Sequence, residues 1–564
     1  MKITPHRAPA AQGSASTKPL ISKGSRMKVY EAVARALGDA GVDTMFGLMG
    51  DANMLYVTAF SETGRQFVAA VSEGSAVSMA DGFSRFGGGV GVVTVTHGPG
   101  ATNAVTALTE AVRARTPLIL LTGDTPAAVP GHGQVLDLAK IADLAGASYA
   151  VSRRSADCVD DLRRAITSAR KTRRPVLLNL PVDFMLDQVT YTPSRPVLVE
   201  YGAPHVDVES EAFDAALGII AAARRPVVIA GRGAAESGAR EAIIRLSDVI
   251  GAPLGTTLMA QGLFAGHPLN IGIIGTVGHV PAMDAVSAAD CVIAFGASLN
   301  RHTSTHGFLF DGKRVIQCDV DPTAFGKTGQ ADVEIVGDAR QVAELLADAL
   351  SGAGIVAPGS QNEALRAALC EYEPLSGLRA QTDVVDMRIA VSEFNAILPR
   401  RRQVVTDCGR FLLAAWKYLE VDEPLKFTHA VHFGSIGLGL ATGIGASVRD
   451  RSCPTVVVAG DGGAMMSLIE LQTATRLGLP LVVLILNDGC YGAEYLKLQQ
   501  YGVDPKHSLL SWPEFGELAV AMGAHARTVR RADDFAAVGA DIAESKFPLV
   551  VDVKCDPSTQ LGEE

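Results

Sequence analysis

The sequence contains few aromatic residues and no excess of positive charge. Phe, Trp and Tyr make up 5% of the 564 residues, and the formal net charge at pH 7 is −10. Proteins that bind nucleic acids present basic surfaces, often with aromatic side chains on which bases stack. We therefore expect no nucleic acid among the partners of this protein.

Long apolar runs and paired cysteines are also missing. No apolar stretch approaches the length of a membrane-spanning helix, so we expect no membrane association. The eight cysteines form no CxxC pair and show no zinc-site spacing, which indicates a reducing compartment. We predict a cytoplasmic protein.

The first 26 residues lack Asp and Glu, and they lack the apolar centre of a secretory signal. We expect residues 1–26 to be a disordered leader, or sequence ahead of a true start at Met27. A transit peptide is the alternative, because such peptides are often rich in Ser and free of acidic residues.

Apolar residues are abundant, and they are arranged in short runs. Hydrophobic residues make up 48% of the chain and charged residues 20%, as in a globular protein with several cores. Strand-like runs such as VGVVTVT, RPVVIAG and TVVVA alternate with helical stretches. This alternation predicts an α/β fold with mostly parallel sheets covered by helices. Linkers rich in Pro, Gly, Ala and Ser separate three predicted domains, residues 27–190, 205–352 and 362–557.

The most informative segment runs from the apolar stretch TVVVA to Gly489. A GDGG turn and a helical stretch follow TVVVA, and a second apolar run then ends in Asn-Asp-Gly. Two neighbouring parallel strands would bring Asp461 and Asn487 to one edge of a sheet, where α/β proteins bind ligands. A carboxylate, an amide oxygen and a backbone carbonyl suit Mg²⁺, and the N–H groups of Gly462 and Gly463 at a helix start suit phosphate.

This block resembles the diphosphate and metal motif of thiamine diphosphate enzymes, in which an NDG element follows a GDG element. The three-part layout is similar to the acetolactate synthase, benzoylformate decarboxylase and 2-hydroxyacyl-CoA lyase branch of that family. The resemblance implies three doubly wound domains: pyrimidine-binding, middle and diphosphate-binding. It also implies thiamine diphosphate and Mg²⁺ as cofactors. Gly460, Gly462 and Gly463 would then contact the diphosphate, and Asp461, Asn487 and Gly489 would hold the metal.

Glu73 is the candidate for activating the cofactor. It follows the apolar run FVAAV, and the helix after it carries ADGFSR, which resembles the family pattern A-[DE]-G-Y-A-R. The resemblance gives Glu73 the task of hydrogen-bonding the aminopyrimidine ring and promoting the tautomer that takes the thiazolium proton. The alternative is a carboxylate that only stabilises the start of a helix.

The glycine-rich segment HFGSIGLGLATGIGA resembles the family's G-S-I-G element. By that resemblance, the carbonyl of Gly434 would meet the 4′-amino group of the cofactor, and Ile436 would hold the two rings bent. Ser435, which lies between these two residues in the sequence, would also bind the cofactor. Glycine in a helix interior costs roughly 1 kcal/mol, so the pattern indicates close approach of the backbone to another group. Tight helix packing is the alternative explanation.

Four further positions come from weaker similarities. His97 lies in HGPGATN, where many relatives have Ser, and it would either exchange a proton near neutral pH or serve as a structural hydrogen-bonding group. Gln134, with His132 beside it, lies in a loop that resembles one near the cofactor in acetolactate synthases. Arg410 follows a D-x-G segment and would pair with the diphosphate; a surface arginine is the alternative.

These observations predict a lyase or carboligase that acts on 2-keto acids or 2-hydroxy ketones, as acetolactate synthase does. A 2-keto acid or acyl-CoA decarboxylase or lyase is the alternative, and a non-catalytic paralogue is a weaker one. A requirement for FAD is doubtful, because GASLNRHTSTHG stands where the family has G-A-R-F-D-D-R. The resemblance also implies a homodimer or homotetramer with active sites between chains.

Overall fold

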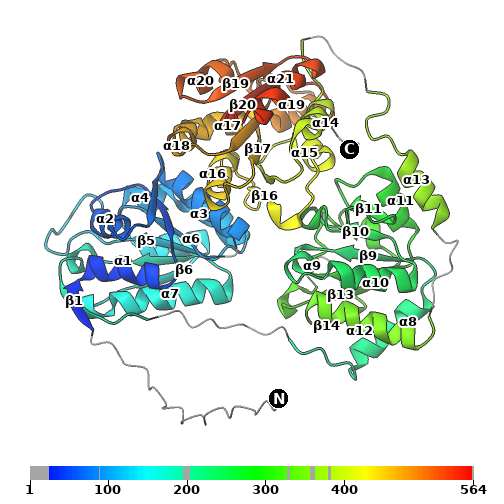
Figure 1. Cartoon of the computed structure of the whole chain (residues 1–564), viewed down its shortest axis with the longest axis horizontal. Helices are drawn as coiled ribbons and strands as arrows, with labels where there is room; N and C mark the ends of the chain where they lie inside the picture. Colours follow the sequence, from blue (N-terminus) through cyan, green and yellow to red (C-terminus); the bar gives the residue numbers. More distant parts are fainter. Residues whose placement is uncertain are drawn as a thin grey trace, which may run out of the picture.

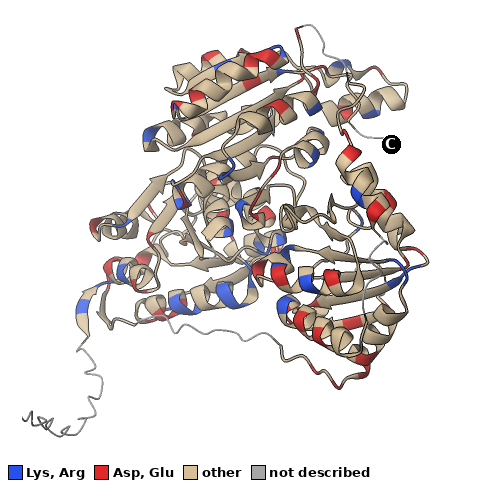
Figure 2. Cartoon of the chain, turned by 45° about the vertical axis from the view of Figure 1, so that its right-hand side comes forward, with Lys and Arg blue, Asp and Glu red and all other residues tan. Residues whose placement is uncertain are grey.

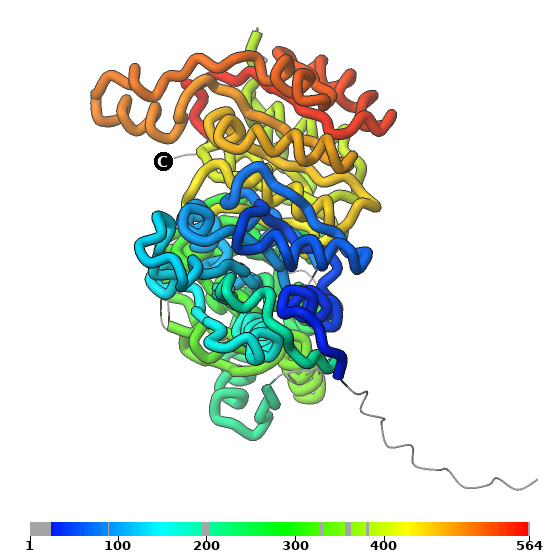
Figure 3. Tube along the Cα trace, turned by 90° about the vertical axis from the view of Figure 1, so that its left-hand side faces the viewer, coloured from blue at the N-terminus to red at the C-terminus, as the bar shows by residue number. Residues whose placement is uncertain are grey.

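The computed structural model describes residues 24–87, 89–194, 204–326, 329, 331–355, 362–378 and 383–561. Three six-stranded sheets follow one another along the chain, each covered by helices. In Figures 1 and 3 the C-terminal domain lies above the other two. Acidic and basic residues are interspersed along the helices of all three domains (Figure 2). In the described part of the chain, no helix is long and apolar enough to cross a membrane.

The first sheet is wholly parallel. Its strands, in spatial order, are β3 (Gln66–Ala69), β2 (Thr44–Gly47), β4 (Gly91–Thr94), β5 (Leu118–Thr122), β7 (Val176–Asn179) and β6 (Ser148–Val151). Its helices are α1 (Val29–Asp39), α2 (Met54–Glu62), α3 (Glu73–Gly87), α4 (Pro99–Asn103), α5 (Val105–Arg113), α6 (Leu138–Ala145) and α7 (Cys158–Thr172). A separate antiparallel pair joins β1 (Ser25–Lys28) to β8 (Gln188–Tyr191).

The middle sheet is also parallel. Its spatial order is β11 (Asn270–Ile273), β10 (Leu254–Thr256), β9 (Pro226–Ala230), β12 (Cys291–Phe295), β13 (Arg314–Asp319) and β14 (Val333–Val336). Its helices are α8 (Glu211–Ala222), α9 (Arg232–Glu236), α10 (Arg240–Ile250), α11 (Val280–Ala288) and α12 (Ala339–Gly352), and α13 (Glu363–Glu371) follows them.

The third sheet carries the most informative segment of the sequence. Its spatial order is β16 (Phe427–His429), β15 (Gln403–Thr406), β17 (Thr455–Gly460), β18 (Leu481–Asn487), β20 (Leu549–Lys554) and β19 (His525–Val529), all parallel. Its helices are α14 (Met387–Ile397), α15 (Leu412–Tyr418), α16 (Gly439–Arg449), α17 (Asp461–Ser467), α18 (Leu471–Leu477), α19 (Gly492–Gln500), α20 (Phe515–Ala521) and α21 (Phe535–Ala543). Strands β17 and β18 read as unbroken apolar runs because helices cover both faces of the sheet.

The predicted fold class, three α/β domains with mostly parallel sheets, is confirmed. The exact domain boundaries stay predictions. Residues 1–23 of the predicted leader lie outside the described residues. Ser25 and Arg26, which the prediction included in the leader, belong to β1, because they pair with Tyr191 and Thr190 of β8.

The first and third domains meet where α3 crosses α16. A Cβ atom at Gly82 of α3 would collide with the carbonyl of Thr442, and one at Gly445 of α16 would collide with the carbonyl of Met79. The two backbones are therefore in direct contact. Buried side chains of both domains form one continuous core around this crossing.

Replacing Gly82 or Gly445 with Ala should separate the two domains locally and destabilise the protein by about 1–3 kcal/mol, because the crossing has no room for a methyl group. Denaturant unfolding measures this. Gly218→Ala is the matched control, since Gly218 lies in α8 with open space around it, and Ala there should be neutral or stabilising by up to about 1 kcal/mol. Equal stability of all three variants would contradict the close crossing.

Candidate active site

The oxygens of Asp461 and Asn487 lie side by side at the carboxyl edge of the third sheet. Both residues end or follow parallel neighbouring strands, since Gly460 of β17 stands opposite Leu486 of β18. The N–H of Gly489 donates to Oδ2 of Asp461 at 2.8 Å and to Oδ1 of Asn487 at 3.3 Å. The amide nitrogen of Asn487 donates to Asp552 at 2.9 Å, which keeps its oxygen turned toward Asp461.

This donor set fits a hard divalent cation. Burial and the nearby charge of Asp488 raise the pKa of Asp461 to about 7, and a bound cation would favour the ionised carboxylate that it needs. Among the described residues, no cluster of three or more His, Cys, Asp and Glu side chains could hold a metal. A site here would therefore use carboxylate, amide and carbonyl oxygens, the set that suits Mg²⁺.

Two glycines of the GDGG turn, Gly462 and Gly463, are closely packed. A Cβ at Gly462 would lie 2.8 Å from the ring of Tyr491, and one at Gly463 would collide with the carboxylate of Asp407. The N–H of Gly462 donates to Asp461 at 2.7 Å. The turn lies at the start of α17, the kind of place at which backbone N–H groups can bind an anion.

The segment Gly434–Ile436 lies beside this turn. Gly434 has φ +79° with open space at its Cβ position, so glycine is needed there for the backbone conformation rather than for room. A Cβ at Gly437 would lie 2.9 Å from Met466 of α17. Ser435 and Ile436 are half-buried.

Glu73 begins α3 and is 9% exposed. The side-chain amide of Asn103 donates to its Oε2 at 3.1 Å. The two preceding residues, Val71 and Ser72, donate their backbone N–H groups to Glu470 of the third domain, at 2.9 and 3.0 Å. Glu73 is thus held next to the boundary with the third domain.

Comparison with known proteins identifies the family of the chain. Three family models match successive parts of the chain: the N-terminal thiamine pyrophosphate (TPP) binding domain over residues 27–141, the central domain of thiamine pyrophosphate enzymes over 213–346 and the C-terminal TPP binding domain over 407–553. The chain belongs to the thiamine pyrophosphate enzyme family. It is a thiamine diphosphate-dependent enzyme, as predicted, and its similarities place it in the acetolactate synthase branch.

Two groups of relatives illustrate that branch. Acetolactate synthase isozyme 3 large subunit of Escherichia coli is 30% identical over 87% of this chain and 88% of its own length. Probable acetolactate synthase large subunit of Methanocaldococcus jannaschii is 29% identical over 95% and 93%. Sulfoacetaldehyde acetyltransferase of Alcaligenes xylosoxydans xylosoxydans is 30% identical over 95% and 94%.

In this thiamine diphosphate enzyme, His97, His132 and Gln134 form one cluster. Nε2 of His97 lies 2.8 Å from Oε1 of Gln134, and the rings of His97 and His132 meet edge to face with centroids 5.7 Å apart. The backbone N–H of Gln134 donates to His132 at 3.2 Å. His97 is 3% exposed, and its Nδ1 has no hydrogen-bond partner within the described structure. The first domain thus holds a buried imidazole with one free nitrogen.

The guanidinium of Arg410 is engaged within the protein. It forms an ion pair with Asp488 at 2.9 Å and donates to the carbonyls of Thr559 and Asp556 at 2.8 and 3.2 Å. Its side chain is 7% exposed. The arginine therefore ties Asp488 of the NDG element to the C-terminal segment, and pairing with a diphosphate would compete with these contacts.

Asp407 was not among the residues predicted from the sequence. It is 1% exposed and accepts the N–H groups of Gly437, Leu438 and Gly439, at distances from 2.8 to 3.2 Å. Burial raises its pKa to about 6, against the opposing effect of these N–H groups. Asp407 thereby fixes the end of the GSIG element at the start of α16, and it also lies against Gly463. The D-x-G segment that drew attention to Arg410 contains this aspartate.

Replacing Asp407 with Ala should destabilise the protein by about 2–4 kcal/mol, because three buried or partly buried N–H groups lose their acceptor. Asn, which keeps one acceptor oxygen, should cost less. Denaturant unfolding measures both variants. Asp338→Ala is the control: Asp338 caps α12 in the middle domain, and its loss should cost only about 1 kcal/mol. An Asp407→Ala variant no less stable than this control would contradict the assigned role.

Proposed function

We propose that this enzyme is a thiamine diphosphate- and Mg²⁺-dependent lyase or carboligase that acts on 2-keto acids or 2-hydroxy ketones. The observation that carries the proposal is the pair of oxygens from Asp461 and Asn487 beside a turn in which Gly462 and Gly463 are closely packed. The similarity to acetolactate synthases and to a sulfoacetaldehyde acetyltransferase supports carbon–carbon bond formation or group transfer. We place the enzyme in the cytoplasm, with all eight cysteines as free thiols.

The residues divide by the part of the cofactor that they would contact. Asp461, Asn487 and the carbonyl of Gly489 would hold Mg²⁺, and Gly460, Gly462 and Gly463 would face the diphosphate. When bound, thiamine diphosphate supplies a nucleophilic carbon that adds to the substrate carbonyl. The carbonyl of Gly434 and the side chain of Ile436 would orient the rings. Glu73 would hold a proton at the aminopyrimidine end.

His97 and Gln134 would face the reacting carbonyl compound. Because Nε2 of His97 faces the acceptor oxygen of Gln134, Nε2 carries the hydrogen of the neutral ring, and the free Nδ1 can take a proton. A proton-exchanging group at this place supports the second candidate, a 2-keto acid or acyl-CoA decarboxylase or lyase. Mass spectrometry of the products from pyruvate, benzoylformate, a 2-hydroxyacyl-CoA and aldehyde pairs separates the two candidates: a ligated product supports the first, and only an aldehyde or a cleaved acyl-CoA supports the second.

We propose that FAD is not required, because segment 296–307 departs from the family pattern.

We also propose a homodimer or homotetramer with active sites between chains. Val71, Met466 and Ile469 are exposed next to Glu73 and the GSIG element, with exposed fractions of 38%, 63% and 53%. Exposed apolar groups beside functional segments are typical of subunit interfaces.

Asp461→Ala should abolish metal-dependent cofactor binding, because it removes the carboxylate that would hold the metal. Isothermal titration with thiamine diphosphate and Mg²⁺ measures this, and omitting Mg²⁺ from the wild type should have a similar effect. Asp338→Ala, at a helix start in the middle domain, should bind normally. Unchanged affinity in Asp461→Ala would refute the metal site.

Glu73→Gln should fold and bind cofactor but lose most turnover, because Gln keeps the shape and lacks the carboxylate. Proton exchange at the thiazolium carbon, followed by NMR, should slow by orders of magnitude.

Mixing Glu73→Gln with Asp461→Ala under subunit exchange should restore activity, since one site of each mixed dimer would be intact. Verified exchange without recovered activity would show that each chain builds its own site.

A further inference from the structure

The two predicted cofactor-contacting segments of this chain are each held by a buried glutamate from the other domain. Residues 434–436 of the third domain follow Phe433, whose N–H donates to Glu110 of the first domain at 2.6 Å. Glu73 of the first domain follows Ser72, whose N–H donates to Glu470 of the third domain at 3.0 Å. The arrangement is reciprocal and lies within one chain.

Glu110 uses both of its carboxylate oxygens. It is 2% exposed, on α5, and its Oε1 lies 2.8 Å from Nδ1 of His432, while Oε2 accepts the Phe433 N–H. Arg113, one turn further along α5, lies over the ring of Phe433 at 4.6 Å. Helix α5 therefore contacts backbone, imidazole and phenyl ring of residues 432–433.

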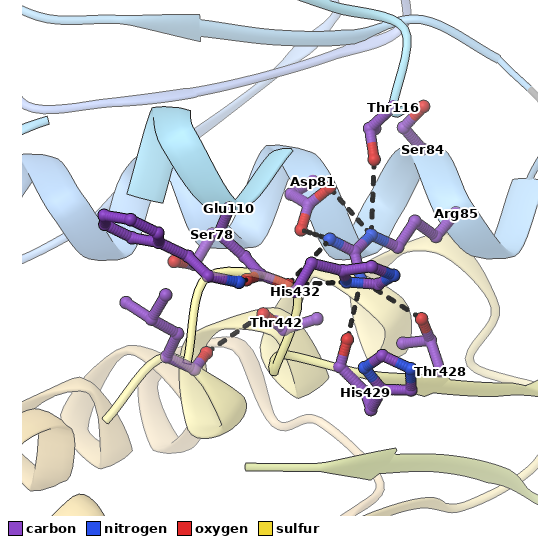
Figure 4. A network of polar contacts seen from close by, with 12 residues as sticks. Ser78, Asp81, Ser84, Arg85, Glu110, Thr116, Thr428, His429, His432 and Thr442 are labelled. Atoms are coloured by element: carbon purple, nitrogen blue, oxygen red, sulfur yellow. Dashed lines mark hydrogen bonds and ion pairs between the residues drawn. The ribbon is translucent and has the colours of Figure 1, made fainter. Parts of the chain in front are cut away.

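A second group of contacts supports this one (Figure 4). Arg85 of α3 forms ion pairs with Asp81 at 2.6 Å and with Glu110 at 3.4 Å, and it donates to the carbonyl of His429 at 2.8 Å. The rings of His429 and His432 stack with centroids 4.4 Å apart. Burial acts to raise the pKa of Glu110, but the hydrogen bond from His432 and the charge of Arg85 outweigh it and lower the pKa to about 2. The carboxylate is thus charged at any working pH.

Residues 434–436 consequently lie between two carboxylates. Glu110 holds the residue before them, and Asp407 holds the N–H of Gly437 after them at 2.8 Å. Asp407 belongs to the same domain as the segment, whereas Glu110 does not. The position of the segment therefore depends on how the first domain docks.

Glu470 of the third domain holds the backbone of the first domain, as Glu110 of the first domain holds the backbone of the third. It is fully buried, its Oε1 accepts the N–H groups of Val71 and Ser72, and its Oε2 accepts the hydroxyl of Thr473 at 2.8 Å. Thr473 belongs to the third domain, so Glu470 is anchored there. Its contacts end one residue before Glu73.

We propose that Glu110 and Glu470 are reciprocal positioning residues: each fixes, across the domain boundary of its own chain, the backbone next to a cofactor-contacting segment. This inference rests on the proposed function, because that function makes Glu73 and residues 434–436 the cofactor contacts. Neither glutamate is a catalytic residue. Their effect is on the geometry of the segments.

Hydrogen–deuterium exchange of the protein without cofactor tests the proposal. Glu110→Gln should speed exchange of the amides of residues 433–436 by about ten-fold and leave those of residues 71–76 unchanged. Glu470→Gln should do the reverse, so each variant is the control for the other. Asp81→Asn removes one charge from the same Arg85 network without touching either segment, and it should change neither set.

Cofactor titration gives the second readout. Glu110→Gln should weaken the affinity for thiamine diphosphate with Mg²⁺ by about ten-fold, and Asp81→Asn should not. If Glu110→Gln fails to fold, Glu110→Asp keeps the charge beside Arg85 but withdraws the carboxylate from Phe433, and the same local exchange is expected. The proposal would be overturned if Glu110→Gln and Glu470→Gln changed the exchange rates of the two segments equally. It would also be overturned if Asp81→Asn changed exchange and cofactor affinity as Glu110→Gln does. Wild-type protein that bound no cofactor would instead refute the proposed function, and the exchange comparison would still decide the positioning role.

Discussion

The crossing of α3 and α16 is the contact on which the arrangement of the site depends. Gly82 and Gly445 let the two backbones touch, so the helices have one relative position rather than a range. Helix α3 begins with Glu73, and α16 begins directly after the GSIG element. A single backbone contact therefore sets where two segments more than 350 residues apart in sequence stand in space.

Buried carboxylates then hold the backbone of the loops around the site in one conformation. Asp407, Glu110 and Glu470 are each 2% exposed or less, and each accepts backbone N–H groups of a loop rather than pairing only with another side chain. An ionised carboxylate accepts several hydrogen bonds, and charge-assisted bonds of this kind are roughly twice as strong as neutral ones. Burying such a group is favourable only where every partner is in place, so the loops around the site have little freedom.

The sequence predicted the parts of the site that are local in the chain. The GDGG turn, the NDG element and the parallel strands before them are set by neighbouring residues, and β17 and β18 have the predicted pairing. His97 and Gln134 were proposed separately from two loops of the same domain, and their mutual contact was not predicted. Glu110 and Glu470 could not be identified, because each looks like an ordinary helical glutamate, and its partner backbone lies more than 300 residues away. The contacts of Arg410 could not be predicted either. Its position next to a D-x-G segment did not reveal that its guanidinium already pairs with Asp488 and donates to the C-terminal segment.

The two explanations considered for the glycine-rich segment are not exclusive. Gly434 and Gly437 have positive φ and belong to the loop, whereas Gly445 lies in the following helix and makes the close crossing with α3. One glycine-rich stretch thus shapes the loop at its first half and docks the other domain at its second half. The reciprocal glutamates then join the two functions, because the docking that Gly445 permits is what brings Glu110 to Phe433 and Val71 to Glu470. In an assembly with sites shared between chains, the segments that these glutamates hold in one chain would serve two different sites, and the rigidity of the chain would fix the distance between those sites.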